Sequence, residues 1–275
     1  MSAVMAESLI LMGASCASMY EVSVHSASSP VDMSHVDPCL ISNLIIILLT
    51  LAAIVHAIRG ILKENVTEMA AYVVSVSVAC IFIVIDYRSH MKLLPALVSM
   101  YTCAIGTPIC ILLARFACCK FKCHRIVGAA DSLRYMYEER THLLVIMRMD
   151  LVFMIVYALV SFSLNTRGSF YGYYTCCAII LLSLLKWIIG KVALMREVTP
   201  LLNLYVILTM MSHLWIPVHL LLSLCFTDSC GRRRREYSYL STAAAAAIIF
   251  DQVYIMVYLL RVFRNFGYGL TDRGE

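Results

Sequence analysis

Hydrophobic residues along this chain gather into seven long runs that are separated by short polar segments. Each run holds roughly 20 mostly apolar residues, the length that crosses an apolar core of about 30 Å as a helix. The runs cover residues 39–58, 69–86, 93–117, 143–163, 174–194, 201–226 and 240–260. We predict that every run is a transmembrane helix, because an isolated span in lipid can satisfy its backbone polar groups only in that form.

Composition supports this pattern. Of the 275 residues 61% are hydrophobic and 14% are charged, and the mean hydropathy is +0.84, whereas soluble domains carry about 25% charged residues. We therefore predict an all-α, polytopic membrane protein whose surroundings are the lipid bilayer, with no nucleic acid partner. It divides into a mostly irregular N-terminal tail (1–38), a seven-helix bundle (39–260) and a short C-terminal tail (261–275).

Lysine and arginine positions predict the orientation, because positive residues in short loops are retained on the cytoplasmic side. If the N-terminal tail lies outside, the cytoplasmic segments hold 13 of the 22 basic residues and the outer segments hold 7. We therefore place the N-terminus outside and the C-terminus in the cytoplasm, in either the plasma membrane or an endomembrane. If the run 174–194 did not span, the contrast would fall to 12 against 9, so seven spans are preferred.

Two motifs bear on this orientation. The run Arg232 to Arg235 falls on the outer side, where we interpret it as a solvated loop. Asn65-Val66-Thr67 fits the N-glycosylation pattern but falls on the cytoplasmic side, so we expect it to stay unmodified. A glycan on Asn65 would reverse the orientation.

Ionisable residues inside the runs are the candidate functional site. Asp150, Lys186 and Asp251 all fall within about 5 Å of the midplane at 1.5 Å per residue, and His213 lies at the middle of its run. An unpaired charge there costs on the order of 2.5 to 3.5 kcal/mol. We predict an intramembrane polar cluster of these four residues, in which Asp251 faces Lys186 or His213 and Asp150 is a second acceptor. Structural pairing between helices, with no ligand or proton involved, is an equally weighted alternative.

Prolines and a tryptophan predict a flexible region. Pro108 and Pro217 each remove a backbone donor within a run, so both should kink their helices. Together with Trp215 they form a predicted hinge or pocket.

Three cysteines follow the third run. Cys118, Cys119 and Cys123 stand among basic residues just below the membrane, a setting that suits S-palmitoylation; inert cysteines are the main alternative. No run offers histidines at i and i+4, so we predict no metal site. We also expect no cofactor and no enzymatic activity, since the chain holds no trio of serine, histidine and acid at plausible depth, no phosphate-binding loop and no metal-ligand spacing.

Trp215-Ile216-Pro217 is similar to the W-x-P of the sixth helix in rhodopsin-like G-protein-coupled receptors. The helix number and orientation also resemble that family, and the resemblance implies a ligand-sensitive hinge. The chain departs from the family in the seventh run, where it has "DQVY" instead of N-P-x-x-Y. We predict a receptor-like protein that senses an outside ligand and couples to a cytoplasmic signalling partner through the basic loop 118–140. The alternatives are an ion- or proton-coupled transporter or channel that uses the midplane cluster, and a non-catalytic accessory subunit of a membrane complex.

Overall fold

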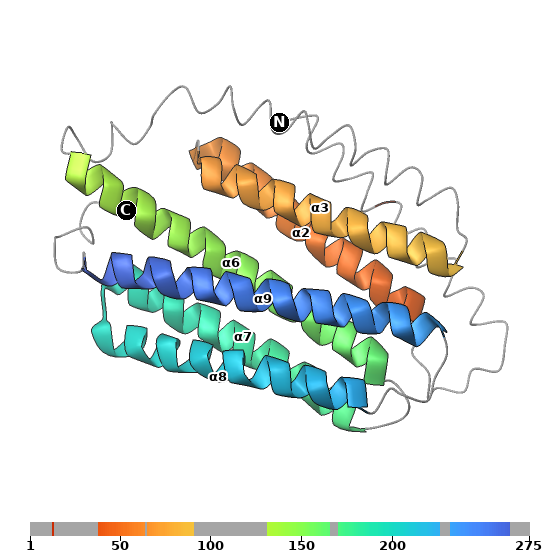
Figure 1. The fold of residues 1–275 in the computed structure, drawn as a ribbon. Coiled ribbons are helices and arrows are strands. Elements are labelled where there is room, and N and C mark those ends of the chain that lie inside the picture. Colours follow the sequence, from red (N-terminus) through yellow and green to blue (C-terminus); the bar gives the residue numbers. More distant parts are fainter. Residues whose placement is uncertain are drawn as a thin grey trace. The chain divides into compact units, whose positions relative to one another are not determined.

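A computed structural model of the protein describes Gly13 and residues 38–63, 65–90, 131–165, 170–225 and 232–264. The regular structure in these ranges is entirely helical. The helices are α2 (Pro38–Lys63), α3 (Val66–His90), α6 (Asp131–Asn165), α7 (Phe170–Arg196), α8 (Thr199–Cys225) and α9 (Arg232–Arg264) (Figure 1). They belong to two compact units, α2 and α3 in the first and α6 to α9 in the second.

The first unit is a helical hairpin with a short connection. The backbone N–H of Asn65 donates to the carbonyl of Gly60 (3.0 Å), which satisfies an acceptor at the end of α2. The side-chain Oδ1 of Asn65 accepts from the backbone N–H of Thr67 (3.0 Å), so this residue caps the start of α3. Asn65, the residue of the glycosylation pattern, therefore has a structural role.

In the second unit, α7 and α8 are neighbours joined by a tight turn. Glu197 has φ 53°, and the N–H of Val198 donates to the carbonyl of Ala193 (3.1 Å). This is the Schellman arrangement, in which a left-handed residue closes the last helical turn. Pro200 follows in the first turn of α8, where a missing backbone donor costs little.

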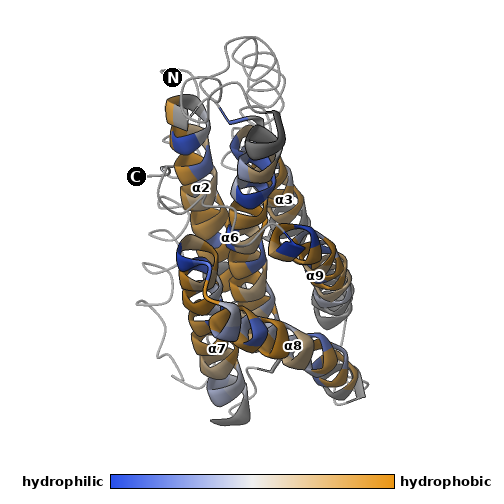
Figure 2. Ribbon diagram, turned by 90° about the vertical axis from the view of Figure 1, so that its left-hand side faces the viewer, coloured by the Kyte–Doolittle hydropathy of each residue, from blue (hydrophilic) through white to orange (hydrophobic). Residues whose placement is uncertain are grey.

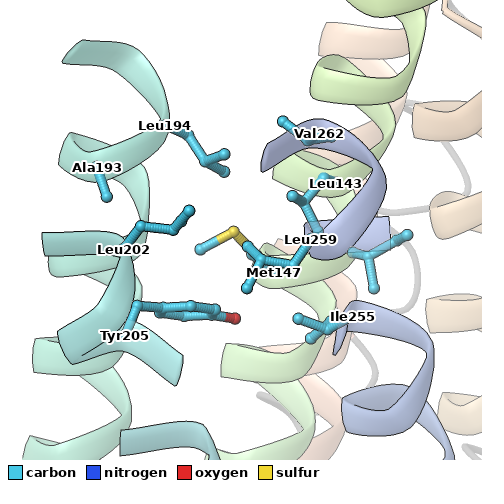
Figure 3. Packing of buried hydrophobic residues seen from close by; sticks show 10 residues of the cluster. Leu143, Met147, Ala193, Leu194, Leu202, Tyr205, Ile255, Leu259 and Val262 are labelled. Carbon is cyan, nitrogen blue, oxygen red and sulfur yellow. The ribbon is translucent and has the colours of Figure 1, made fainter. Parts of the chain in front are cut away.

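Two apolar clusters hold the four helices of the second unit together. The first draws on all four helices, and Figure 3 shows Met147, Tyr205 and Leu259 meeting at its centre. Its buried residues are Leu143, Ile146, Met147, Ala193, Leu194, Leu202, Tyr205, Ile255, Leu259 and Val262. The second consists of Met154, Tyr157, Ala158, Ile179, Ile216, Ala245 and Ile248.

Gly190 lets α7 approach its neighbours at the level of the first cluster. A Cβ atom at this position would overlap the methyl carbon of Met147 and would lie 2.7 Å from Cδ2 of the Tyr205 ring. Both neighbours are buried, so neither can move aside without disturbing the cluster.

Five helical stretches are long and apolar enough to cross a membrane: Ile41–Gly60, Met136–Ser163, Gly172–Arg196, Thr199–Leu221 and Ser241–Arg264. Figure 2 shows hydrophobic residues along most of each helix. Large apolar side chains on them are also exposed, with Leu214 73% and Phe250 77% accessible, as expected for surfaces that face lipid. These findings support an all-α, multi-pass integral membrane protein.

The five stretches coincide with the first, fourth, fifth, sixth and seventh predicted runs. The second run lies within α3, whose apolar stretch Thr67–Ile83 is shorter. The third run, 93–117, lies outside the described residues, as do most of the N-terminal tail and residues 265–275.

Two predicted loops are helical instead. Residues 131–142, assigned to the long cytoplasmic loop, form the start of α6. Leu133, Met136 and Glu138 in this segment are residue types with high helix propensity. The four arginines from Arg232 form the first turn of α9, and arginine also has high helix propensity. At its other end α9 continues to Arg264, past the predicted limit of 260.

Candidate functional site

Charged side chains from two helices form an ion pair inside the second unit. Asp150 lies on α6 and Lys186 on α7, and the Lys186 Nζ atom is 2.5 Å from Oδ2 of Asp150. The two side chains are only 1% and 3% exposed. Burial on this scale is costly for either charge alone, so each residue stabilises the other.

The ion pair leaves hydrogen-bonding capacity unused. Among the described residues, Oδ1 of Asp150 has no hydrogen-bond partner, and the approach of Lys186 Nζ to Oδ2 is close but not aligned as a hydrogen bond. Charge attraction therefore holds the pair, and both groups can take a further partner.

A second carboxyl group stands beside this pair. Asp251 on α9 is half-buried and interacts electrostatically with both Asp150 and Lys186. Its Oδ2 atom is buried and makes no hydrogen bond to a described residue. We predicted that Asp251 would face Lys186 or His213, but the ion-pair partner that the structure gives Lys186 is Asp150.

Tyr205 on α8 completes the group. The side chain is 1% exposed, and its hydroxyl has no hydrogen-bond partner within the described ranges. Figure 3 shows the hydroxyl directed away from α8 toward α6 and α9, and it interacts electrostatically with Asp150 and Asp251. We call Asp150, Lys186, Tyr205 and Asp251 the polar centre. Sequence reasoning missed Tyr205, although a buried tyrosine in a span needs a partner for its hydroxyl.

His213 belongs to a different group. Its Nδ1 lies 3.0 Å from Oε1 of Gln252, and the Gln252 amide donates to Oγ of Ser212 (3.1 Å). Gln252 is wholly buried. Sequence reasoning could have identified Gln252 as a polar residue inside an apolar run, but it singled out only the charged neighbour, Asp251.

Tyr157 and His219 form a further buried pair. The Tyr157 hydroxyl and Nδ1 of His219 are 3.0 Å apart, while Nε2 of His219 has no hydrogen-bond partner in the part of the chain that is described. The Trp215 ring lies 6.3 Å from the His219 ring. Trp215 is 44% exposed and Pro217 is also exposed, and the hinge role of these two residues stays a prediction.

The remaining candidate residues lie outside the described part of the chain. These are Pro108 and the cysteines Cys118, Cys119 and Cys123. Within the residues that are described, no group of three or more histidine, cysteine or acidic side chains is placed to hold a metal ion.

The first unit contains a buried pair that sequence reasoning also missed. Nδ1 of His56 on α2 lies 2.6 Å from Oε2 of Glu68 on α3, and the side chains are 2% and 1% exposed. The sequence feature that could have predicted this pair is a histidine and an acid on either side of the short connection between two helices.

Comparison with known proteins gives no relative. No protein-family model, no curated protein and no solved structure matches this chain.

Proposed function

We propose that the second unit binds and moves a proton or a small cation at the polar centre, so that the protein acts as an ion- or proton-coupled transporter or channel. One observation carries this proposal: ionisable side chains from three helices meet in the buried interior with acceptor atoms that have no hydrogen-bond partner among the described residues. Intramembrane ionisable groups of this kind are typical of ion pathways and proton relays.

The charge balance of the polar centre favours a positively charged occupant. When Asp150, Lys186 and Asp251 are all ionised, two carboxylates stand against one ammonium group, which leaves one negative charge in excess. A purely structural ion pair would need only Asp150 and Lys186. The second acid adds a cost in the membrane interior that a bound proton or cation would offset.

A receptor function has less support. It would use a ligand pocket beside Trp215 and Pro217, yet both residues are exposed on α8. We therefore favour transport over ligand sensing. The proposed function depends on the polar centre and not on coupling through the loop 118–140.

For the topology we propose seven spans, with the N-terminus outside and the C-terminus in the cytoplasm. The distribution of lysine and arginine supports this arrangement. An acceptor site for N-glycosylation introduced near residue 20 should receive a glycan, and a C-terminal epitope should be protected from protease in intact cells. A glycan on Asn65 instead would contradict the arrangement.

The function is tested by Asp251→Asn in purified protein reconstituted into liposomes. We expect wild-type liposomes to take up protons, K⁺ or Ca²⁺ faster than empty ones under an imposed potential, each followed with its own indicator dye. Asp251→Asn should lower that uptake by about tenfold or more, because it removes the excess negative charge and leaves the Asp150–Lys186 pair in place. The matched control is Glu138→Gln, which removes an exposed acid from α6 and should leave the uptake unchanged.

Two outcomes would overturn the proposal. One is wild-type uptake no faster than that of empty liposomes for all three ions. The other is an Asp251→Asn variant that takes up the ion as fast as wild type.

A further inference from the structure

The buried faces of α6 to α9 differ on the two sides of the polar centre. On α7, α8 and α9 the buried positions recur every three or four residues, as on the inner face of a helical bundle. On one side of the centre these positions, together with those of α6, include polar side chains at successive levels: Thr209, Ser212, His219, Ser241, Ser183, Tyr157 and Ser161. We call this side, toward the ends of α6 and α8, the polar half.

Polar groups in this half form steps about two helical turns apart. The first step beyond Tyr205 is Ser212 with His213 and Gln252, level with Asp251 of the centre, and the second is Tyr157 with His219. From Tyr205 to His219 the rise is about 21 Å, which is most of the apolar thickness of a bilayer. The polar steps therefore extend from the centre toward the ends of α6 and α8, with apolar side chains of the second cluster between them.

Several atoms along these steps can form a further hydrogen bond. Nε2 of His219, Oγ of Ser161 and Oγ of Ser241 are buried and have no hydrogen-bond partner within the described residues. A buried polar atom left unpaired is costly, so such atoms indicate places where water or a transported ion is bound.

On the other side the centre is closed by the first apolar cluster. The buried positions next to the centre are Met147, Ile255, Leu202 and Leu259, and the ring of Tyr205 forms the boundary (Figure 3). The next polar contact on this side is between Nε2 of His142 on α6 and the Tyr254 hydroxyl on α9 (3.0 Å). Beyond it Arg140 donates to the carbonyl of Met195 (3.2 Å) at the end of α7. An ion leaving in this direction would have to pass about 12 Å of mostly apolar packing, at 1.5 Å per residue from Asp150 to His142.

We infer that the polar centre is reached through the polar half alone, from the membrane side where α6 and α8 end, and that the first apolar cluster is the gate toward the opposite side. The inference rests on the proposed transport function and assigns its entry route and its barrier. Transport across the whole membrane then requires the helices to separate at Met147, Tyr205 and Leu259.

Cysteine labelling tests this inference without measuring transport. Thr209→Cys, Ser212→Cys and Ser241→Cys place thiols in the polar half; Leu143→Cys, Leu202→Cys and Leu259→Cys place them in the gate. The reagent is the membrane-impermeant cation methanethiosulfonate ethyltrimethylammonium, applied to full-length protein in liposomes. Intact-protein mass spectrometry then counts adducts above those of the unsubstituted protein, which has 12 cysteines of its own.

We expect the polar-half thiols to react at least about tenfold faster than the gate thiols, because the gate positions react only after local opening. Equal rates in both halves, or faster reaction at Leu259→Cys than at Ser212→Cys, would overturn the inference. So would a lack of reaction at all three polar-half positions in variants that purify as wild type does.

A second variant separates this inference from the proposed function. Met147→Ala with Leu259→Ala should raise passive ion leak through liposomes and should make Leu202→Cys reactive, because it removes bulk from the gate. Asymmetric labelling without any ion uptake would reject the transport function and leave the route standing. Uptake that depends on Asp251, with uniform labelling, would reject the route alone.

Discussion

Lys186→Met is expected to destabilise the α6–α9 unit by about 3 kcal/mol, because it leaves the Asp150 carboxylate buried without its cation. The two side chains are 3% and 1% exposed and their charged atoms are 2.5 Å apart. Methionine matches the length and apolar stem of lysine, so the loss should come from the charge and not from a cavity.

Double variants show which acid is the partner. Lys186→Met combined with Asp150→Asn should recover most of the lost stability, since no unpaired charge remains at the pair. Lys186→Met combined with Asp251→Asn should recover less, because Asp150 would still be alone. The matched control is Lys191→Met on the same helix. Lys191 is exposed and lies over the Trp187 ring, so its loss should cost only about 0.5–1 kcal/mol.

Unfolding of the purified protein in detergent micelles, followed by denaturant titration, measures these differences. Equal recovery from the two double variants would mean that the two carboxyl groups share Lys186 evenly. No recovery in either would contradict the pairing.

His56→Leu is expected to loosen the α2–α3 hairpin by about 2 kcal/mol, because it removes the imidazole that lies 2.6 Å from the buried carboxyl group of Glu68. The effect should be local to the first unit. Hydrogen exchange followed by mass spectrometry should therefore show faster exchange in α2 and α3, with α6 to α9 unchanged.

The double variant His56→Leu with Glu68→Met should restore slow exchange, since it removes both polar groups together. Val55→Ala is the control, because Val55 is adjacent in sequence but 44% exposed and should have little effect on exchange. Faster exchange in Val55→Ala than in His56→Leu would show that the pair does not stabilise the hairpin.

Hydrophobic length was sufficient to predict where most helices lie. Five of the predicted runs coincide with apolar helices of spanning length, because lipid leaves an isolated backbone no alternative to the helix. The polar ends of the helices were less predictable than their apolar middles. Residues 131–142 continue α6 in the same helix, and nothing in their hydropathy distinguishes such an extension from a loop, whereas their helix propensity does.

The sequence predicts a common depth for the charged residues, but it does not predict which of them pair. Counting residues from the middle of each run places Asp150, Lys186 and Asp251 at a common level. Which acid faces Lys186 depends on the rotation of each helix about its own axis, and that rotation is determined by packing contacts such as Tyr205 against Gly190. His213 illustrates the same limit, since its partner is Gln252, a neutral residue that a search for charges passes over.

Gly190 stands four residues after Lys186, on the same face of α7. Its missing side chain lets α7 settle against Met147 and Tyr205, and so it governs how near the ammonium group comes to Asp150. A Gly190→Ala substitution, which adds one methyl group, would retain every charge and could still separate the charged pair. A substitution at Gly190 during evolution would require matching changes on both α6 and α8. An uncharged residue therefore influences the electrostatic interactions in the membrane interior.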